Sequence, residues 1–289
     1  MTLDAATHGE LFRLRDLIQA YAGLRLEEAK LMALLPRLNP VLQALGCKDL
    51  PALGDLLLRE MAFGAGKAWE AVIPLVTINE TYFFREMHQL EIFRTHLVPE
   101  LQRRNAVRRH LKILSAPCST GAEPYTLAML LEQGPSSLTG WRVEIHGVDI
   151  DAPVLEQAKQ GIYPKSAFRS TDAAQLERWF RPEGDRYRIV DRIRNGVIFK
   201  QGNLLEMPKW AGFREFDVIL CRNLLIYFDQ STQKRLVDIF YQALNPGGYL
   251  LLGHSESLLT LGTRFLPDPT HRAMVYYKPE QETGAWSLL

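Results

Sequence analysis

The chain has 289 residues, with 34 lysines and arginines against 33 aspartates and glutamates, and its formal net charge is +1. Because the positive and negative charges are nearly equal, the composition excludes a general binder of nucleic-acid phosphates or of acidic membrane surfaces. No apolar run reaches the roughly 20 residues of a membrane-spanning helix, and the polar N-terminus lacks the pattern of a signal peptide. Cys47, Cys118 and Cys221 form no CxxC pair, which excludes a disulfide framework and a zinc finger and predicts no metal site. We therefore expect a soluble globular protein of the cytoplasm.

Residues 1–72 predict a helical domain. Apolar residues recur at intervals of three and four through LFRLRDLIQAYAGL, EEAKLMALLPRLNPVLQALG and LPALGDLLLREMAF. We expect Pro36, Pro40 and Gly46 to interrupt the second of these stretches. A small helical bundle is the simplest interpretation, and a surface that docks a partner is the alternative.

Residues 73–84 predict a linker, because this aromatic-rich stretch suits neither a clean helix nor a strand. A helical stretch, LEIFRTHLVPELQRR, follows it. Segment 85–112 is the most basic part of the chain, with seven basic side chains against three acidic ones. The segment is either a solvated helix end and turn or a surface that receives an acidic partner. Its basic residues are Arg85, Arg94, Arg103, Arg104, Arg108, Arg109 and Lys112.

From residue 111 onwards, short apolar runs alternate with helical patterns. The runs LKILSAP, RVEIHGVDID, FDVILCRN and YLLLGHSE predict strands, and helical patterns follow the first three. This alternation predicts an α/β fold with a Rossmann-like parallel sheet that helices cover on both faces. Ligands of such folds bind beyond the carboxyl ends of the strands. The candidate site therefore comprises the sequences SAPCSTG, GVDID, GNLL and CRNLLIY.

Residues 165–200 interrupt the alternation. They contain the runs YRIV and VIFK, with Asn195 and Gly196 as a tight-turn signal between them, and predict a small antiparallel β insertion. Residues 281–289 have the composition of a loose tail. The expected plan is a helical domain (1–72), a linker (73–84), a main domain (85–280) that contains the insertion (165–200), and the tail.

The turn at residues 115–124 indicates the kind of ligand. Its small residues allow a ligand to contact the backbone, but neither GxGxxG nor GxxxxGK[ST] occurs. A ligand without a pyrophosphate is therefore favoured, and S-adenosylmethionine meets that description. Asp149, at the end of the second strand, is placed to accept hydrogen bonds from ribose hydroxyls, whereas Asp151 suits a helix cap. Glu123 either caps the first helix or faces the cationic end of the ligand, and the sequence leaves both open.

Six stretches, spread from about residue 77 to 257, resemble the chemotaxis receptor methyltransferases of the CheR family in order and spacing. They are NETYFFR, SAPCSTGAEPY, GVDID, NLL, FDVILCRNLLIYF and NPGGYLLLGHSE. The resemblance implies an S-adenosylmethionine-dependent enzyme with a class I methyltransferase fold, a protein-glutamate O-methyltransferase. Its substrates would be glutamate side chains on the cytoplasmic helices of chemoreceptors, and its products glutamate methyl esters and S-adenosylhomocysteine.

The resemblance also implies roles for individual residues. Those expected to contact the cofactor are Asn79, Thr81, Arg85, Glu123, Asp149, Asn203, Leu204, Arg222 and Asn223. Among them, Asn203 and Leu204 would flank the adenine. Arg85 and Tyr227 resemble the two residues nearest to the transferred methyl, so we expect them to be catalytic. Ala122 stands where the family more often has an acidic residue, and we expect a weaker peripheral charge there.

The same family includes members that tether to a receptor tail through a longer, glycine-containing loop in the β insertion. Here the corresponding stretch, residues 181–186, is short. We therefore expect the protein to bind the cytoplasmic domain of a chemoreceptor directly, without a tail-pentapeptide tether. Neither nucleic acid nor an inserted membrane segment is expected as a partner.

The expected chemistry needs few catalytic groups. A carboxylate that attacks a sulfonium methyl needs no general base, because glutamate is already ionised near pH 7. The protein must instead align the reacting atoms and exclude water. His254 and Glu256, in the motif GHSE, are therefore expected to be structural. We expect Cys118 and Cys221 to be packing residues rather than nucleophiles.

Two alternatives belong to other functional classes. The first is a methyltransferase that acts on nucleic acid or a small molecule, but RNLLIY does not supply the NPPY-like tetrapeptide that an amino-methylating DNA enzyme would need. The second is a non-catalytic protein that senses S-adenosylmethionine and docks on a receptor. Retention of Arg85 and Tyr227 speaks against it.

Overall fold

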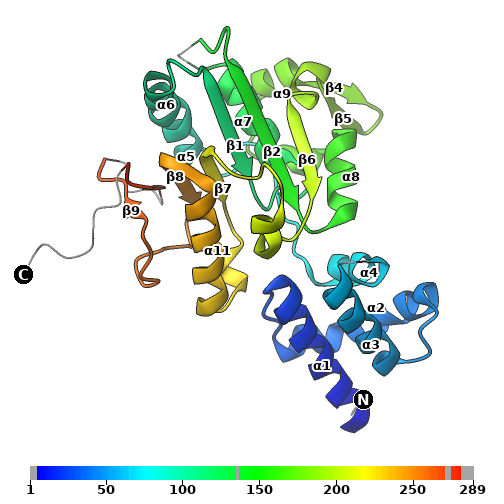
Figure 1. Ribbon diagram of the computed structural model, residues 1–289. Coiled ribbons are helices and arrows are strands. Elements are labelled where there is room, and N and C mark those ends of the chain that lie inside the picture. The colour runs from blue at the N-terminus through cyan, green and yellow to red at the C-terminus, as the bar shows by residue number, and fades with distance from the viewer. Residues whose placement is uncertain (1–4, 65, 135–136, 271–274, 281–289) are drawn as a thin grey trace, which may run out of the picture. The chain divides into compact units, whose positions relative to one another are not determined.

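The computed structural model describes the chain except for residues 1–4, 65, 135–136, 271–274 and 281–289, so the expected tail lies outside the described residues. The described chain divides into two compact units (Figure 1). The helical unit comprises Met1–Ile78 together with Asp151–Pro153 and Tyr227–Thr232. The sheet unit comprises Asn79–Ile150, Val154–Ile226 and Gln233–Leu289.

The helical unit is built from amphipathic helices, as the periodicity predicts. They are α1 (Ala5–Ala22), α2 (Glu28–Leu45), α3 (Leu50–Phe63) and α4 (Lys67–Val76). Their apolar faces meet in a core that includes Leu11, Ile18 and Trp69, and the Trp69 ring stacks on Tyr21 with centroids 3.9 Å apart. Asp49 begins α3 by accepting a hydrogen bond from the Ala52 amide at 2.9 Å.

The expectation that two prolines interrupt the second helix is wrong. Helix α2 continues through Pro36 and Pro40 and ends at Gly46, which has a left-handed φ of 65°. A proline inside a helix removes a backbone hydrogen bond, but α2 buries a continuous apolar face that includes Leu34 and Leu38. Tertiary packing of that face outweighs the local cost.

The sheet unit contains a seven-stranded sheet within its described residues, in the order β6-β2-β1-β7-β8-β10-β9. The strands are β1 (His110–Ser115), β2 (Arg142–Asp149), β6 (Val197–Gln201), β7 (Phe216–Cys221), β8 (Leu244–Leu252), β9 (Leu266–Pro267) and β10 (Val275–Tyr277). The first five in this order are parallel, and β10 and β9 add an antiparallel edge. The predicted Rossmann-like α/β fold is confirmed. Its strand order reverses between β1 and β7, where such folds bind ligands.

Helices lie on both faces of this sheet. Figure 1 shows α7 (Ala122–Glu132) behind the strands and α11 (Gln230–Ala243) in front of them. Other elements of the unit are α5 (Met87–Ile92), the π-helical turn η1 (Phe93–Leu97), α6 (Val98–Arg104) and α8 (Ala152–Gln160). The core between α7 and the strands contains Leu127, Leu130 and Ile113, all at most 2% exposed. Burial of this kind stabilises the fold by roughly 1.5–3 kcal/mol per large apolar side chain.

The β insertion is a separate three-stranded antiparallel sheet in the order β3-β5-β4. Its strands are β3 (Ile162–Pro164), β4 (Phe180–Glu183) and β5 (Arg186–Ile189), and it lies near η2 (Lys165–Phe168), α9 (Ala173–Trp179) and α10 (Asp191–Arg194). The run VIFK does not belong to it, contrary to expectation, because VIFK forms β6 and pairs in parallel with β2. A short apolar run predicts a strand but does not identify its partner.

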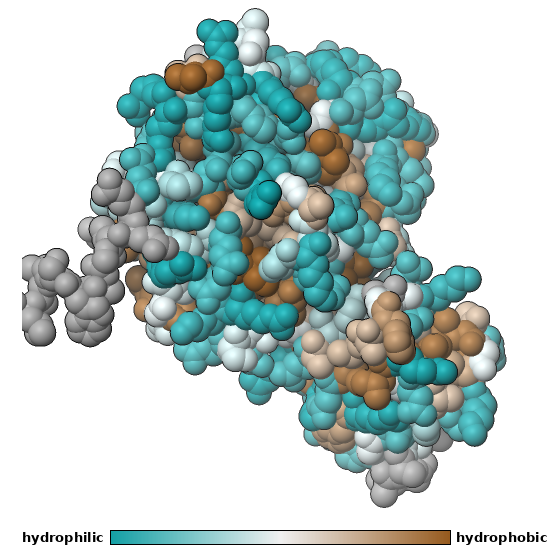
Figure 2. All heavy atoms as spheres, viewed as in Figure 1, coloured by the Kyte–Doolittle hydropathy of each residue, from teal (hydrophilic) through white to brown (hydrophobic). Residues whose placement is uncertain are grey.

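No helix among the described residues is long and apolar enough to cross a membrane. Figure 2 shows hydrophilic residues over most of the visible face of the sheet unit, with apolar residues gathered towards its middle.

Candidate active site

The candidate site lies where the central parallel strands end. Register pairs Ser115, the last residue of β1, with Gly147 of β2 on one side and Leu220 of β7 on the other. The turns that follow the three strands are therefore neighbours. Each turn carries residues that the sequence predicts to be functional.

The turn after β1 gathers three of the predicted residues. The Ser119 amide donates a hydrogen bond to the Asp149 carboxylate at 2.7 Å, and the Ser119 hydroxyl donates to the Asn79 carbonyl at 3.2 Å. The Ser115 hydroxyl donates to Glu123 at 2.8 Å. Gly121 is required here, because its φ is 84° and a Cβ would stand 2.9 Å from another side chain. Asn79, Glu123 and Asp149 therefore converge on one rigid turn.

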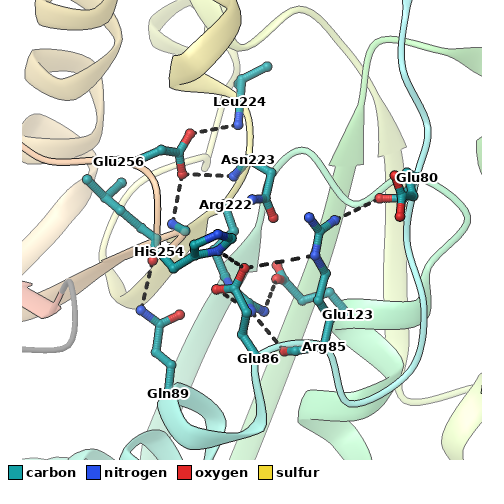
Figure 3. Close-up of polar contacts among 12 residues, drawn as sticks. Glu80, Arg85, Glu86, Gln89, Glu123, Arg222, Asn223, Leu224, His254 and Glu256 are labelled. Atoms are coloured by element: carbon teal, nitrogen blue, oxygen red, sulfur yellow. Dashed lines mark hydrogen bonds and ion pairs between the residues drawn. The ribbon is translucent and has the colours of Figure 1, made fainter. Parts of the chain in front are cut away.

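Arg222 joins the turn after β7 to the rest of the site (Figure 3). Its guanidinium, only 3% exposed, donates to Glu123 at 2.8 Å, to Glu86 at 3.0 Å and to the Arg85 carbonyl at 2.8 Å. Burial alone would lower the pKa of Arg222, but the charges of Glu123 and Glu86 outweigh it and the pKa is raised. Within the described residues, the buried Nε–H has no partner. We call Arg222, Glu86 and Glu123 the Arg222 network.

Glu86 is a site residue that the sequence analysis missed. Its carboxylate pairs with Arg222, accepts a hydrogen bond from His254 Nδ1 at 2.8 Å, and lies 3.9 Å from Arg85 Nε (Figure 3). Burial raises the pKa of Glu86, but Arg222 and His254 more than compensate and hold it below its ordinary value. The available signal was an acid directly beside the predicted catalytic arginine.

The backbone at this edge adopts conformations that are uncommon outside glycine. Phe84, Glu86, Ser119 and Asn223 all have positive φ, between 48° and 61°. Left-handed backbone is rare for a bulky residue such as Phe84, and such geometry persists only where the surroundings enforce it. Strain of this kind clusters at functional sites, which agrees with the position of these four residues.

Asn203 and Leu204, two further predicted cofactor residues, lie beside the end of β2. Asn203 is 6% exposed and begins the 3₁₀ helix η3 (Leu204–Lys209) by accepting a hydrogen bond from the Leu205 amide at 3.0 Å. Gly202, just before it, donates to the Asp149 carbonyl at 2.9 Å, which places Asn203 and Leu204 next to β2. Thr81 is half-buried.

Tyr227 belongs to the helical unit. It ends the 3₁₀ helix η4 (Leu225–Tyr227), and its carbonyl accepts a hydrogen bond from the Arg25 amide at 2.9 Å. The Lys30 ammonium lies 5.9 Å from the centre of its ring. These contacts fix the surroundings of Tyr227 in its own unit, and its catalytic role stays a prediction.

Two sets of secondary candidates have clear structural positions. Cys118 and Cys221 are buried, and burial raises the pKa of both thiols well above the usual range, which agrees with the expectation that they are packing residues. His254, by contrast, has a side chain that is 71% exposed and hydrogen-bonded to Glu86. It lies at the rim of the Arg222 network rather than in the core.

The basic segment 85–112 reaches from the carboxyl ends of the parallel strands to their amino ends. Arg85 lies at the carboxyl ends, whereas Arg108, just before β1, pairs with Asp217 at the amino ends. Strand β1 separates the two ends by about 20 Å. Arg94, in η1, pairs with Glu91 of α5. A surface of this segment that receives an acidic partner stays a prediction.

The Rossmann-like sheet, with acids at the carboxyl ends of its strands and no pyrophosphate-binding glycine loop, matches the architecture that the sequence predicts for an S-adenosylmethionine-dependent methyltransferase. Residues 79–272 match the family described as CheR methyltransferase, SAM binding domain. The chain belongs to this family and uses S-adenosylmethionine.

Curated relatives agree with this assignment. The chain is 38% identical over 218 residues to chemotaxis protein methyltransferase 2 of Vibrio cholerae serotype O1. These residues make up 75% of this chain and 75% of that protein. It is 34% identical to chemotaxis protein methyltransferase Cher2 of Pseudomonas putida over 92% of this chain and 94% of that protein. Among solved structures, PKMT2 from Rickettsia typhi in complex with AdoHcy aligns at 19% identity with a TM-score of 0.32, over 50% of this chain and 21% of that one.

Proposed function

We propose that the protein transfers methyl groups from S-adenosylmethionine to glutamate side chains on the cytoplasmic helices of a chemoreceptor. The observation that carries this proposal is the Arg222 network beside Arg85, at the carboxyl edge of β7 and inside the segment that matches the family. The names of the curated relatives support a chemotaxis substrate. We propose the cytoplasm as its compartment, because such a substrate faces the cytoplasm.

The charges of the network suit this cofactor. Three carboxylates, Glu86, Glu123 and Asp149, face the guanidinium groups of Arg85 and Arg222 in the site, so these five residues carry one net negative charge. When bound, S-adenosylmethionine supplies an electrophilic methyl group on a positively charged sulfur. A site with excess negative charge favours that cation over a neutral nucleoside. The residues that we propose to hold it are Asn79, Thr81, Arg85, Glu123, Asp149, Asn203, Leu204, Arg222 and Asn223.

Arg85 is suited to bind the substrate carboxylate. Its side chain is 23% exposed, and one nitrogen is anchored by donation to the Glu80 carbonyl at 2.9 Å. A guanidinium has five N–H donors, so the anchored side chain retains others for a charge-assisted hydrogen bond to a glutamate. We propose that Arg85 aligns the attacking oxygen and that Tyr227 orients the reacting groups.

Methanol release tests the proposal. The protein is incubated with methyl-labelled S-adenosylmethionine and a receptor cytoplasmic fragment, and the fragment is then treated with mild base. Glutamate methyl esters would release volatile labelled methanol. A label that resists base would indicate N-methylation, and an unlabelled fragment would indicate a non-catalytic sensor. Either result would contradict the proposal.

We also propose that the enzyme docks on its receptor without a tail tether. The β4–β5 hairpin of the insertion turns through Gly184 and Asp185 alone, which supports the absence of a longer binding loop. Calorimetry with a free receptor C-terminal pentapeptide should detect no binding. Tight binding of the pentapeptide would contradict this part of the proposal.

We also propose where the domains of the chain begin and end. Residues 1–72 would form an independent helical domain, joined through 73–84 to the methyltransferase domain at 85–280. Limited proteolysis should cut first within 73–84. Preferred cleavage inside either domain would contradict these boundaries.

A further inference from the structure

Glu256 is a buried carboxylate that the chemistry above does not use. It is 4% exposed, and both of its oxygens accept hydrogen bonds from backbone amides (Figure 3). Oε1 accepts from Leu224 at 2.8 Å and from Leu225 at 2.7 Å. Oε2 accepts from Asn223 at 2.8 Å and from Gly253 at 2.7 Å. Four backbone donors therefore converge on one side chain.

Three of these donors are consecutive residues of the turn after β7. Successive backbone amides around a left-handed residue form a concave anion-binding site, and Asn223 supplies the left-handed residue with φ of 61°. Glu256 fills this concavity with an anion from the protein itself. The conformation of the turn therefore depends on a carboxylate 31–33 residues further along the chain.

The turn that is hydrogen-bonded to Glu256 contains residues of the candidate active site. It begins directly after Arg222, whose side chain bridges Glu86 and Glu123, and it includes Asn223, a proposed cofactor residue. We infer that Glu256 is a positioning residue, which fixes the turn at residues 223–225 and thereby sets Arg222 and Asn223 for cofactor binding. The inference rests on the proposed function of this site, and it replaces the expectation of a merely structural Glu256 with a defined role.

The close packing around Gly253, which also donates a hydrogen bond to Glu256, supports the same inference. A Cβ at Gly253 would stand 2.8 Å from Glu256 Oε2, 2.9 Å from Asn223 Nδ2 and 3.0 Å from the Asn223 amide nitrogen. Real Cβ atoms do not approach other atoms so closely, and two of these three atoms belong to the turn. Glycine is needed there so that the carboxylate can reach the turn.

Glu256→Gln tests the inference. Glutamine has nearly the same shape but only one oxygen, so its NH₂ group must face two backbone N–H donors in either orientation. Calorimetric titration with S-adenosylhomocysteine, well below the melting temperature, should show at least about a tenfold weaker affinity. Gly253→Ala should weaken the affinity in the same direction. Glu256→Asp, which keeps both oxygens, should fall between wild type and Glu256→Gln.

Asp217→Asn is the matched control. Asp217 is a carboxylate of similar burial at the other end of β7, where it accepts hydrogen bonds from Arg108, the Lys112 amide and Asn245. Its replacement should lower the melting temperature and leave the affinity for S-adenosylhomocysteine unchanged. If Glu256→Gln does the same, the inference is overturned. If it does not fold, Gly253→Ala and Glu256→Asp decide, and wild-type affinity in both variants would overturn it.

Affinity also separates this inference from the proposed function. If wild-type protein binds S-adenosylhomocysteine but methylates no receptor fragment, the proposed substrate is wrong, while the ranking of the variants by affinity still tests Glu256.

Discussion

The two ends of strand β7 each carry a buried charge network, and the two networks differ in balance. At the amino end, Asp217 is 2% exposed and pairs with Arg108, so one negative charge meets one positive charge. The Lys112 amide and Asn245 complete its hydrogen bonds, at 2.9 and 3.0 Å. At the carboxyl end, Arg222 meets two carboxylates, and one of its buried N–H groups has no partner among the described residues.

This difference in charge balance indicates that the network at the amino end stabilises the fold, whereas the network at the carboxyl end serves ligand binding. At the amino end, the buried Asp217 carboxylate joins Arg108 to residues of β1 and β8, and its charge is matched by one guanidinium. At the carboxyl end, Glu86, Glu123 and Asp149 outnumber Arg85 and Arg222, which leaves one negative charge where the fold binds ligands, and a cationic cofactor would offset it. Residues of the amino end should therefore affect stability alone, whereas residues of the carboxyl end should affect binding and turnover.

Arg85→Ala should give the largest effect. Loss of the guanidinium removes the group that aligns the substrate carboxylate, and we expect methyl transfer to fall by at least about a hundredfold. The melting temperature should change little, because the Arg85 side chain is partly exposed. Base-released methanol measures the transfer. Arg94→Ala is the control, since among the described residues Arg94 pairs with its helical neighbour Glu91 and with a backbone carbonyl alone. Near-normal transfer by Arg85→Ala would remove Arg85 from the site.

Glu86→Gln should affect both function and stability. Arg222 would retain only one carboxylate partner, so we expect roughly tenfold weaker binding of S-adenosylhomocysteine and a loss of about 1–3 kcal/mol in the free energy of unfolding. Calorimetry and urea unfolding measure the two effects. Glu91→Gln, on the adjacent helix, should change neither by a comparable amount. Unchanged binding by Glu86→Gln would show that the Arg222 network is not part of the cofactor site.

Asp217→Asn should affect stability only. The buried carboxylate would lose its ion pair with Arg108, and we expect the free energy of unfolding to fall by about 1–3 kcal/mol. Urea unfolding measures this loss. A parallel loss of affinity for S-adenosylhomocysteine would break the distinction between the two ends of β7.

The smallest effect concerns pH. The pKa of Glu86 in the folded protein lies below its ordinary value of 4.5, because Arg222 and His254 outweigh the effect of burial. A lowered folded pKa contributes stability that is complete above the unfolded pKa and is lost as the pH falls through the folded pKa. The stability difference between wild type and Glu86→Gln should therefore shrink as the pH falls below about 4.5 and Glu86 becomes protonated. A difference that grows as the pH falls below about 4.5 would contradict the assigned sign.

The sequence predicts the sheet well because each buried strand is a continuous apolar run that ends in polar residues. LKILSAP, RVEIHGVDID and FDVILCRN identify β1, β2 and β7 and the turns after them, and these turns contain Glu123, Asp149 and Arg222, the last of which only the family resemblance singles out. Pairing between distant segments is not encoded in such runs. The sequence pattern places VIFK in the insertion, whereas VIFK pairs with β2, and α2 continues through two prolines because its buried face stabilises it.

The same reason explains what was missed in the site. Glu86 and Glu256 become significant only through partners far away in the chain, Arg222 in one case and the turn at 223–225 in the other. The basic segment 85–112 shows how far neighbours in sequence can lie apart. Helices α5, η1 and α6 run between Arg85 and Arg108 and place these two arginines at opposite ends of the parallel strands.

The most direct test of the central claim is to locate the transferred methyl group. Receptor cytoplasmic fragment methylated by the wild-type protein is digested at neutral or mildly acidic pH, and its peptides are sequenced by tandem mass spectrometry. We predict methyl groups on glutamate side chains, and loss of labelling when those glutamates are replaced by alanine. Methyl groups on lysine, histidine or the N-terminus, or none on any residue, would contradict the claim.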